Sequence, residues 1–221
     1  MVTAGLAMAC ALLAPAKPAA PAKGTTRITY RYAVTGAVSG TATVTTTLVE
    51  GQKTVTTAMA LDQEGQKTNF TSTKSYDSKG FPISIEEITK GPTDTVTRKA
   101  VFHDKKILLH VSAKGKSQDK SVVITQIVAR DLTDPSQFWF LTTHPKPGAV
   151  VRCATFSVQN WTFEKTITTY IGKRSLELGK HHFESNLVNV KTNDSSADVY
   201  LDDSGSLLRF DGPTFRMDRT F

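Results

Sequence analysis

The histidines are the first residues to test for chemistry, because imidazole binds metals and transfers protons near neutral pH. The chain has five histidines, and only His181 and His182 are adjacent. Adjacent residues on a strand point to opposite faces, so these two cannot easily bind one metal ion. The spacings HxH, HExxH and CxxC do not occur. The sequence therefore predicts no metal site and no cofactor.

Two pairs of adjacent acids, Glu86-Glu87 and Asp202-Asp203, are the carboxylates that could serve general acid–base chemistry. Asp202-Asp203 begins a turn, where Asp is favoured because it hydrogen-bonds local backbone groups. We therefore expect these acids to stabilise a turn rather than to take part in catalysis. No GxSxG elbow and no phosphate-cradling glycine loop occurs. A hydrolase that uses Asp202 or His182 is thus a minor hypothesis, and no catalytic residues are predicted.

Residues 1–23 are expected to be a signal peptide and linker. Val2 to Ala14 is apolar, and small residues near Ala14 and Ala16 suit a signal peptidase. The run is too short for a transmembrane span, so we expect export to a periplasmic or extracellular location. One departure is that no Lys or Arg precedes the run. Lipid attachment through Cys10 is a less favoured alternative.

The remaining composition signals are ordinary. The net charge is +7, which could attract anionic partners. Lys and Arg are scattered rather than gathered in one basic run, so we favour a solvated surface and expect no nucleic-acid partner. Cys153 is the only cysteine once residues 1–23 are removed. It can form no intrachain disulfide, and we interpret it as a buried small hydrophobic residue.

Alternating apolar residues define the elements that would have to position any site. A period of two is typical of a strand with one buried face. The stretch from Thr166 to Gly212 shows it best, with turns between its strand-like runs. The faces predicted to be buried carry Ile28, Tyr30, Tyr32 and Val34 in an early strand, and Val188, Val190, Val199 and Leu201 in two later ones.

Turns rich in Gly and Asp recur at nearly regular intervals and separate roughly twelve strands, as in an antiparallel meander. We predict an all-β fold in which residues 24–221 form a single domain. A long open sheet seldom stays flat, so the meander should curl into a barrel or half-barrel. The same patterns predict a polar loop at Lys114–Lys120, an apolar strand at Val122–Val128 and a turn at Gly172-Lys173.

One short helix is expected near 134–142, with Asp134 as its cap and Pro135 in its first turn. It carries four consecutive apolar residues, which cannot all face one core from a single helical turn. Two interpretations stay open: a plug that closes one end of a barrel, and a lid over an apolar cavity. The candidates for ligand binding are Phe138, Trp139, Phe140 and Leu141.

Four segments in order carry a resemblance to known proteins. They are the hairpin Tyr30–Ala42, the turn Gly80-Phe81-Pro82, the segment from Asp131 to Gly148, and the meander from Tyr170 to Phe210. They resemble a family of exported bacterial envelope proteins catalogued as a domain of unknown function. Tyr200 stands where such members often carry Trp. The resemblance implies an envelope-located β fold of barrel type and brings no catalytic residues. In outline the fold is also similar to lipoprotein-carrier barrels.

These observations predict a non-enzymatic exported envelope protein that binds an apolar or amphipathic ligand, such as a lipid, in a β-barrel cavity. A barrel of more than about eight strands has an interior too wide for its own side chains to fill easily. The alternative is a structural or protein-interaction envelope module, which would show a long exposed apolar or edge-strand surface. A hydrolase ranks third. The sequence does not specify protein partners.

Overall fold

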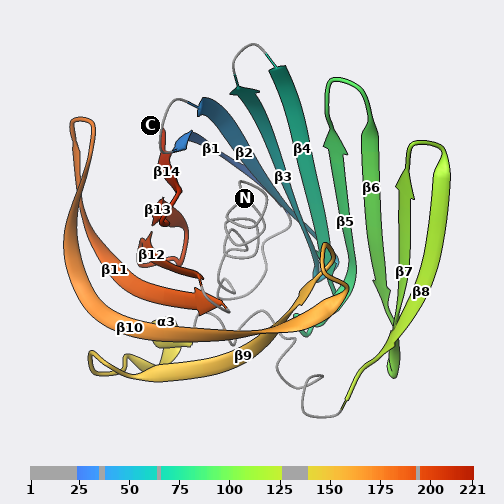
Figure 1. Cartoon of the computed structure of the whole chain (residues 1–221). Helices are drawn as coiled ribbons and strands as arrows, with labels where there is room; N and C mark the ends of the chain where they lie inside the picture. Colours follow the sequence, from blue (N-terminus) through green and yellow to red (C-terminus); the bar gives the residue numbers. More distant parts are fainter. Residues whose placement is uncertain (1–23, 35–37, 64–65, 126–138, 193–194) are drawn as a thin grey trace.

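The structure is a computed structural model that describes residues 24–34, 38–63, 66–125, 139–192 and 195–221. These residues form one antiparallel sheet of fourteen strands, which confirms the all-β meander (Figure 1). Except for β8 and β9, strands that follow one another in sequence are neighbours in the sheet, and β1 also pairs with β14. The two edges are therefore β8 and β9. In the described part of the chain, no helix is long and apolar enough to cross a membrane.

Eight strands form the N-terminal wing of the sheet, running from its centre to the β8 edge. They are β1 (Gly24–Val34), β2 (Val38–Val49), β3 (Gln52–Gln63), β4 (Gln66–Tyr76), β5 (Pro82–Lys90), β6 (Thr95–Phe102), β7 (Lys106–Ala113) and β8 (Lys116–Val123).

Six strands form the C-terminal wing, preceded by a one-turn helix, α3 (Phe140–Thr143). They are β9 (Val150–Ser157), β10 (Thr162–Leu178), β11 (His181–Thr192), β12 (Ser195–Leu201), β13 (Leu207–Asp211) and β14 (Phe215–Arg219).

The predicted alternation is confirmed at the centre of the sheet. Tyr30 and Tyr32 are 1% exposed, whereas Arg31 between them is exposed. The side chains of Val188, Val190, Val199 and Leu201 are likewise buried. All of them join one apolar cluster, which we call the main cluster. Its side of the sheet is called the inner face, and the opposite side the outer face.

The sheet is strongly curled. In the strand order β6 and β9 stand eleven positions apart, which in a flat sheet would separate them by about 50 Å. The rings of Phe102 in β6 and Phe156 in β9 nevertheless lie 5.8 Å apart, edge to face. The end of the β9–β10 hairpin thus packs on the inner face of the N-terminal wing (Figure 1). The described sheet is curled but not closed, because its two edges are joined by side chains rather than by a strand ladder.

Three local predictions were wrong. The stretch Lys114–Lys120 is not a loop, because Lys114 and Gly115 make a tight turn with positive φ and β8 follows. The strand predicted at Val122–Val128 ends at Val123, and residues 126–138 lie outside the described part. Gly172-Lys173 is not a turn but a β-bulge inside β10, where Gly172 has a φ of 117°. The strand number is fourteen rather than about twelve.

The close approach of β2 to Tyr32 generates a test of the packing on the inner face. Gly40 pairs with Tyr32, and a Cβ at Gly40 would lie 2.2 Å from the Ala60 carbonyl oxygen and 2.4 Å from the Tyr32 hydroxyl. Gly40→Ala should therefore lower the free energy of unfolding by about 1–3 kcal/mol, the usual cost of overpacking. Gly24→Ala, where a Cβ meets nothing within 4 Å, is the matched control. Equal thermal unfolding of the two variants would contradict this packing.

Candidate ligand-binding face

The aromatic segment forms α3, a single helical turn. The carbonyl of Trp139 accepts hydrogen bonds from the hydroxyls of Thr142 and Thr143, at 3.0 and 2.9 Å. His144 adopts a left-handed conformation with φ 45° and ends the turn. The helix predicted near 134–142 is thus confirmed for its last residues. Residues 134–138, including the candidate Phe138, lie outside the described part.

The segment that contains α3 is held in place by Tyr170 of β10. The backbone N–H of Gly148 donates to the Tyr170 carbonyl at 2.8 Å, and the Tyr170 N–H donates to the Ala149 carbonyl at 2.9 Å. The rings of Phe140 and Tyr170 are stacked, with centres 5.6 Å apart. Backbone pairing on one side and ring stacking on the other therefore fix this single turn, which is too short to be stable alone.

The described candidate residues pack against the main cluster. Phe140 is 3% exposed, and Trp139 and Leu141 are partly buried. The Nε1 of Trp139 is buried and has no hydrogen-bond partner among the described residues. This placement on the inner face is shared by the plug and the lid interpretations.

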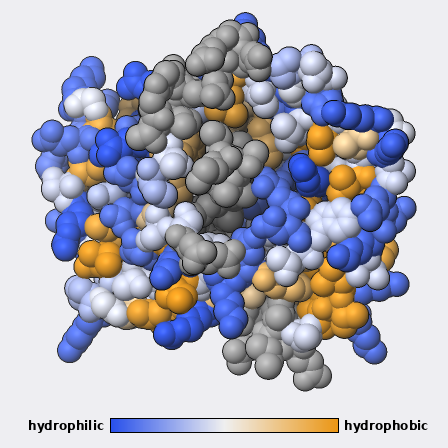
Figure 2. All heavy atoms as spheres, in the orientation of Figure 1, coloured by the Kyte–Doolittle hydropathy of each residue, from blue (hydrophilic) through white to orange (hydrophobic). Residues whose placement is uncertain are grey.

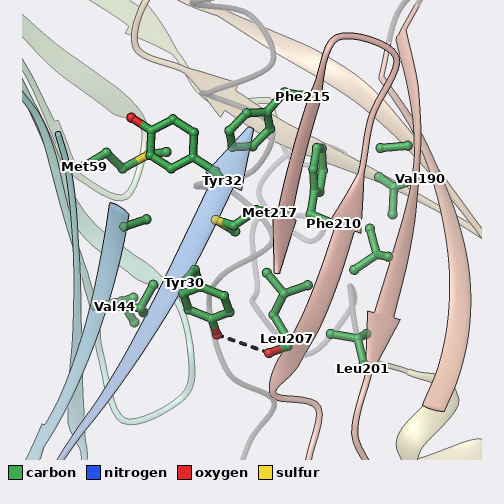
Figure 3. Close-up of a cluster of buried hydrophobic side chains, with 14 of the residues drawn as sticks. Tyr30, Tyr32, Val44, Met59, Val190, Leu201, Leu207, Phe210, Phe215 and Met217 are labelled. Carbon is green, nitrogen blue, oxygen red and sulfur yellow. Dashed lines mark hydrogen bonds between the residues drawn. The ribbon is translucent and has the colours of Figure 1, made fainter. Parts of the chain in front are cut away.

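The main cluster joins side chains from both wings of the sheet (Figure 3). Two of its tyrosines, Tyr30 and Tyr32, are anchored by their hydroxyls. Tyr30 donates to the Leu207 carbonyl at 3.2 Å and Tyr32 to the Ala60 carbonyl at 2.7 Å. Burial raises the pKa of both phenols above the ordinary tyrosine value, so both stay neutral donors. The cluster is therefore apolar and aromatic, and the hydroxyls of Tyr30 and Tyr32 are already paired to the backbone.

A row of polar residues crosses the same inner face, and sequence reasoning missed it. The strand register pairs Thr57 with Ser72, Ser72 with Glu87, and Glu87 with Arg98. Thr57, Ser72 and Glu87 are only 2%, 1% and 5% exposed. We call these four residues the polar row. One signal was present in the sequence, because Ser72 lies in phase with the buried Phe70 on the same strand.

Glu87 is the most unusual residue of the polar row. Burial raises the pKa of its carboxyl, and the nearby Lys74 and Arg98 and a hydrogen bond with Gln159 oppose that shift only in part. Its Oε2 atom has no hydrogen-bond partner among the described residues, and neither does the hydroxyl of Ser72. A buried carboxyl that is held neutral can donate a hydrogen bond.

A further cation, Lys53, lies on the same face of β3 as Thr57. Its ammonium stands 4.8 Å from the ring centre of Tyr76. Burial lowers the pKa of Lys53 to about 8, so its ammonium is still mostly protonated at neutral pH. Lys74 projects from β4 on this face, opposite Val55 and Ile85 in the register. The inner face thus combines apolar clusters with several basic side chains.

The acids predicted to make a turn do so. The Oδ1 of Asp202 accepts hydrogen bonds from the backbone N–H groups of Ser204 and Ser206, at 2.9 and 2.8 Å. Asp203 is hydrogen-bonded by Lys173, which lowers the pKa of its carboxyl. Turn chemistry is confirmed for the carboxylate of Asp202, whereas that of Asp203 accepts from Lys173 and Asn186 and Glu87 of the other pair lies within a strand.

The remaining sequence candidates are not brought together. His182 contacts the hydroxyl of Ser175 at 3.4 Å on the surface, and in the described chain it does not contact Asp202. Cys153 is buried, as predicted, at 4% exposure. Within the described residues, no group of three or more His, Cys, Asp and Glu side chains is arranged to hold a metal ion.

One surface groove of about 460 Å³ lies over β6, β7 and β8. Outer-face side chains, among them Lys99, Leu108 and His110, make up most of its lining. His110 pairs with Asp119 at 2.7 Å across β7 and β8. The groove is separate from α3, so it does not bear on the lid interpretation.

No family model, curated protein or solved structure matches this chain. The resemblance to the exported envelope family therefore stays a prediction. The chain's own geometry is a curled inner face that carries an aromatic cluster, a one-turn segment and a polar row.

The raised pKa of Glu87 predicts how stability depends on pH. Between the ordinary pKa of a glutamate and the raised value, the folded protein keeps a proton that the unfolded chain has released. The free energy of unfolding therefore falls as the pH rises through this window. Glu87→Gln removes the effect, so its Tm relative to wild type should increase from about pH 4 to about pH 7.

Thermal unfolding followed by circular dichroism at several pH values would measure this difference. Glu86→Gln is the matched control, because Glu86 precedes Glu87 on β5 and points to the outer face. A Tm difference between Glu87→Gln and wild type that stays constant over the range would contradict the burial of a titrating carboxyl.

Proposed function

We propose that this protein is an exported, non-enzymatic binding protein of the cell envelope, which holds an apolar or amphipathic molecule such as a lipid against its inner face. The observation that carries the proposal is the position of α3. A separate one-turn element lays Trp139, Phe140 and Leu141 on an apolar cluster that both wings of the sheet contribute. An aromatic segment whose backbone pairs with the sheet at Tyr170 is suited to cover a bound chain and to release it.

The curl of the sheet supports the same proposal. Side chains from β3 and β4 and from β11 to β14 belong to one cluster, so a ligand on the inner face would contact both wings. Burial of apolar surface is the main driving force for such binding, at about 25 cal/mol per Å². A chain of methylene groups gains about 0.8 kcal/mol for each one buried.

The interaction-module alternative has weaker support. Such a module would gather exposed apolar residues on one surface. In the described chain the large exposed apolar residues are instead scattered over separate elements: Val49, Leu108, Val123, Val150 and Phe221. On the face drawn in Figure 2, hydrophobic residues form separate groups among hydrophilic ones. The edge strand β8 carries Lys116, Asp119 and Lys120, and charged edges discourage the addition of further strands.

The proposal of export makes a direct prediction about the mature N-terminus. N-terminal sequencing of protein from the native host should give a first residue at or after Lys17, because signal peptidase cuts beyond the apolar run. An acylated Cys10 would instead identify the lipid-attached variant. Recovery of intact Met1 from the cytoplasm would contradict export.

The ligand itself can be sought in protein purified from the native host. Native mass spectrometry and solvent extraction should show a co-purifying amphipathic molecule. Trp139→Ala should reduce its occupancy severalfold, because it removes part of the cover, whereas Phe221→Ala, at an exposed aromatic residue outside the main cluster, is the matched control. A protein that carries no such molecule, and that binds none when lipid extract is added back, would contradict the proposal.

A further inference from the structure

The polar row lies between two apolar clusters on the inner face. On β4, Ser72 stands two residues from Phe70 of the main cluster. On β6, Arg98 stands two residues from Ala100 of the second cluster, which includes Phe102 and Phe156. Thr57, Ser72 and Glu87 are therefore buried among apolar groups, where polar side chains are stable only when hydrogen-bonded.

Two atoms of this row lack the partners that burial demands. The Ser72 hydroxyl and the Glu87 Oε2 have none among the described residues. Each such group destabilises the fold, and two side by side on paired strands are unusual for a face that serves only as a core. Local rules are most often broken in this way at functional sites. The two atoms belong to cross-strand partners, so one bound group could contact both.

The charged side chains around the polar row indicate which chemical group would bind there. Arg98 pairs directly with Glu87 in the register, and Lys74 is near enough to act on the Glu87 carboxyl. Lys53 and Lys120 point to the same face from β3 and β8. Arg98 and Lys74 thus place positive charge beside the row, and the neutral form of Glu87 would be a hydrogen-bond donor. Donors and positive charge together match an acidic oxygen group.

We propose that the polar row, with Lys74 beside it, binds the anionic head group of a single-chain amphiphile, a carboxylate or a phosphate, while the chain lies on the main cluster. The inference rests on the proposed function and specifies its ligand class. The Arg98 guanidinium pairs with the acidic oxygens, in the two-pronged geometry that arginine favours. The Ser72 hydroxyl donates a hydrogen bond to the same group. The chain then runs past Phe70 towards Tyr32 and Met59.

Isothermal titration calorimetry of the purified full chain tests this with three amphiphiles that share a dodecyl chain length: dodecanoate, dodecyl phosphate and neutral dodecyl maltoside, each below its micelle concentration. Wild type should bind at least one of the two acids with an affinity about tenfold or more above that for the maltoside, because a charge-assisted hydrogen bond typically strengthens binding by this factor. A preference for dodecanoate or for dodecyl phosphate identifies the head group.

Arg98→Gln should remove that preference and leave the maltoside affinity unchanged. Lys99→Gln is the matched control, because Lys99 is the next residue on β6 and points to the outer face. If Arg98→Gln fails to fold, Ser72→Ala decides the question with an expected loss of about threefold or more for the acid alone.

An acid preference that persists in the folded Arg98→Gln variant, or in Ser72→Ala, would overturn the head-group site. So would a wild type that binds all three molecules equally, although it would leave the proposed function standing. A wild type that binds none of the three would contradict the proposed function and this inference with it.

Discussion

The edge-to-face contact of Phe102 with Phe156 joins strands that are far apart in the sheet, and the enclosed inner face depends on it. Without this packing and that of the main cluster, fourteen antiparallel strands would make a wide open sheet with the apolar residues of the inner face in water. Trp161 and Lys120 reinforce the contact at the sheet edges. Because side chains rather than backbone hydrogen bonds join the edges, the half-barrel can separate there at lower cost than a closed barrel could.

Strand positions could be read from the sequence wherever one face is apolar. Tyr30 and Tyr32, or Val188 and Val190, alternate with polar neighbours, and their burial follows from the period of two. The method failed at β8, because this edge strand is exposed on both faces and has no alternation to detect. It also failed at Gly172, since a glycine inside a strand and a glycine in a turn have the same appearance in a sequence.

The polar row could not have been predicted in the same way. Ser72, Glu87 and Arg98 are separate letters on three strands, and only the register makes them neighbours. A shift of one residue in β5 would turn Glu87 to the outer face, where an acid needs no explanation. The candidate site chosen from the sequence was therefore the aromatic run at Trp139, because its composition stands out. The polar groups beside the same apolar cluster do not stand out in the sequence and were not chosen.

The bulge at Gly172 explains how one strand serves both faces. On β11, Val188 faces inward and Phe183 outward, as their even and odd positions require. On β10 the partners are Tyr170 and Leu176, two even-numbered residues, so the bulge between them has reversed the alternation. Tyr170 thus points inward to hold Phe140, while Leu176 packs with Leu208 on the outside. The irregularity that a sequence reader takes for a turn is what lets β10 position α3 over the inner face and still bury its own far end.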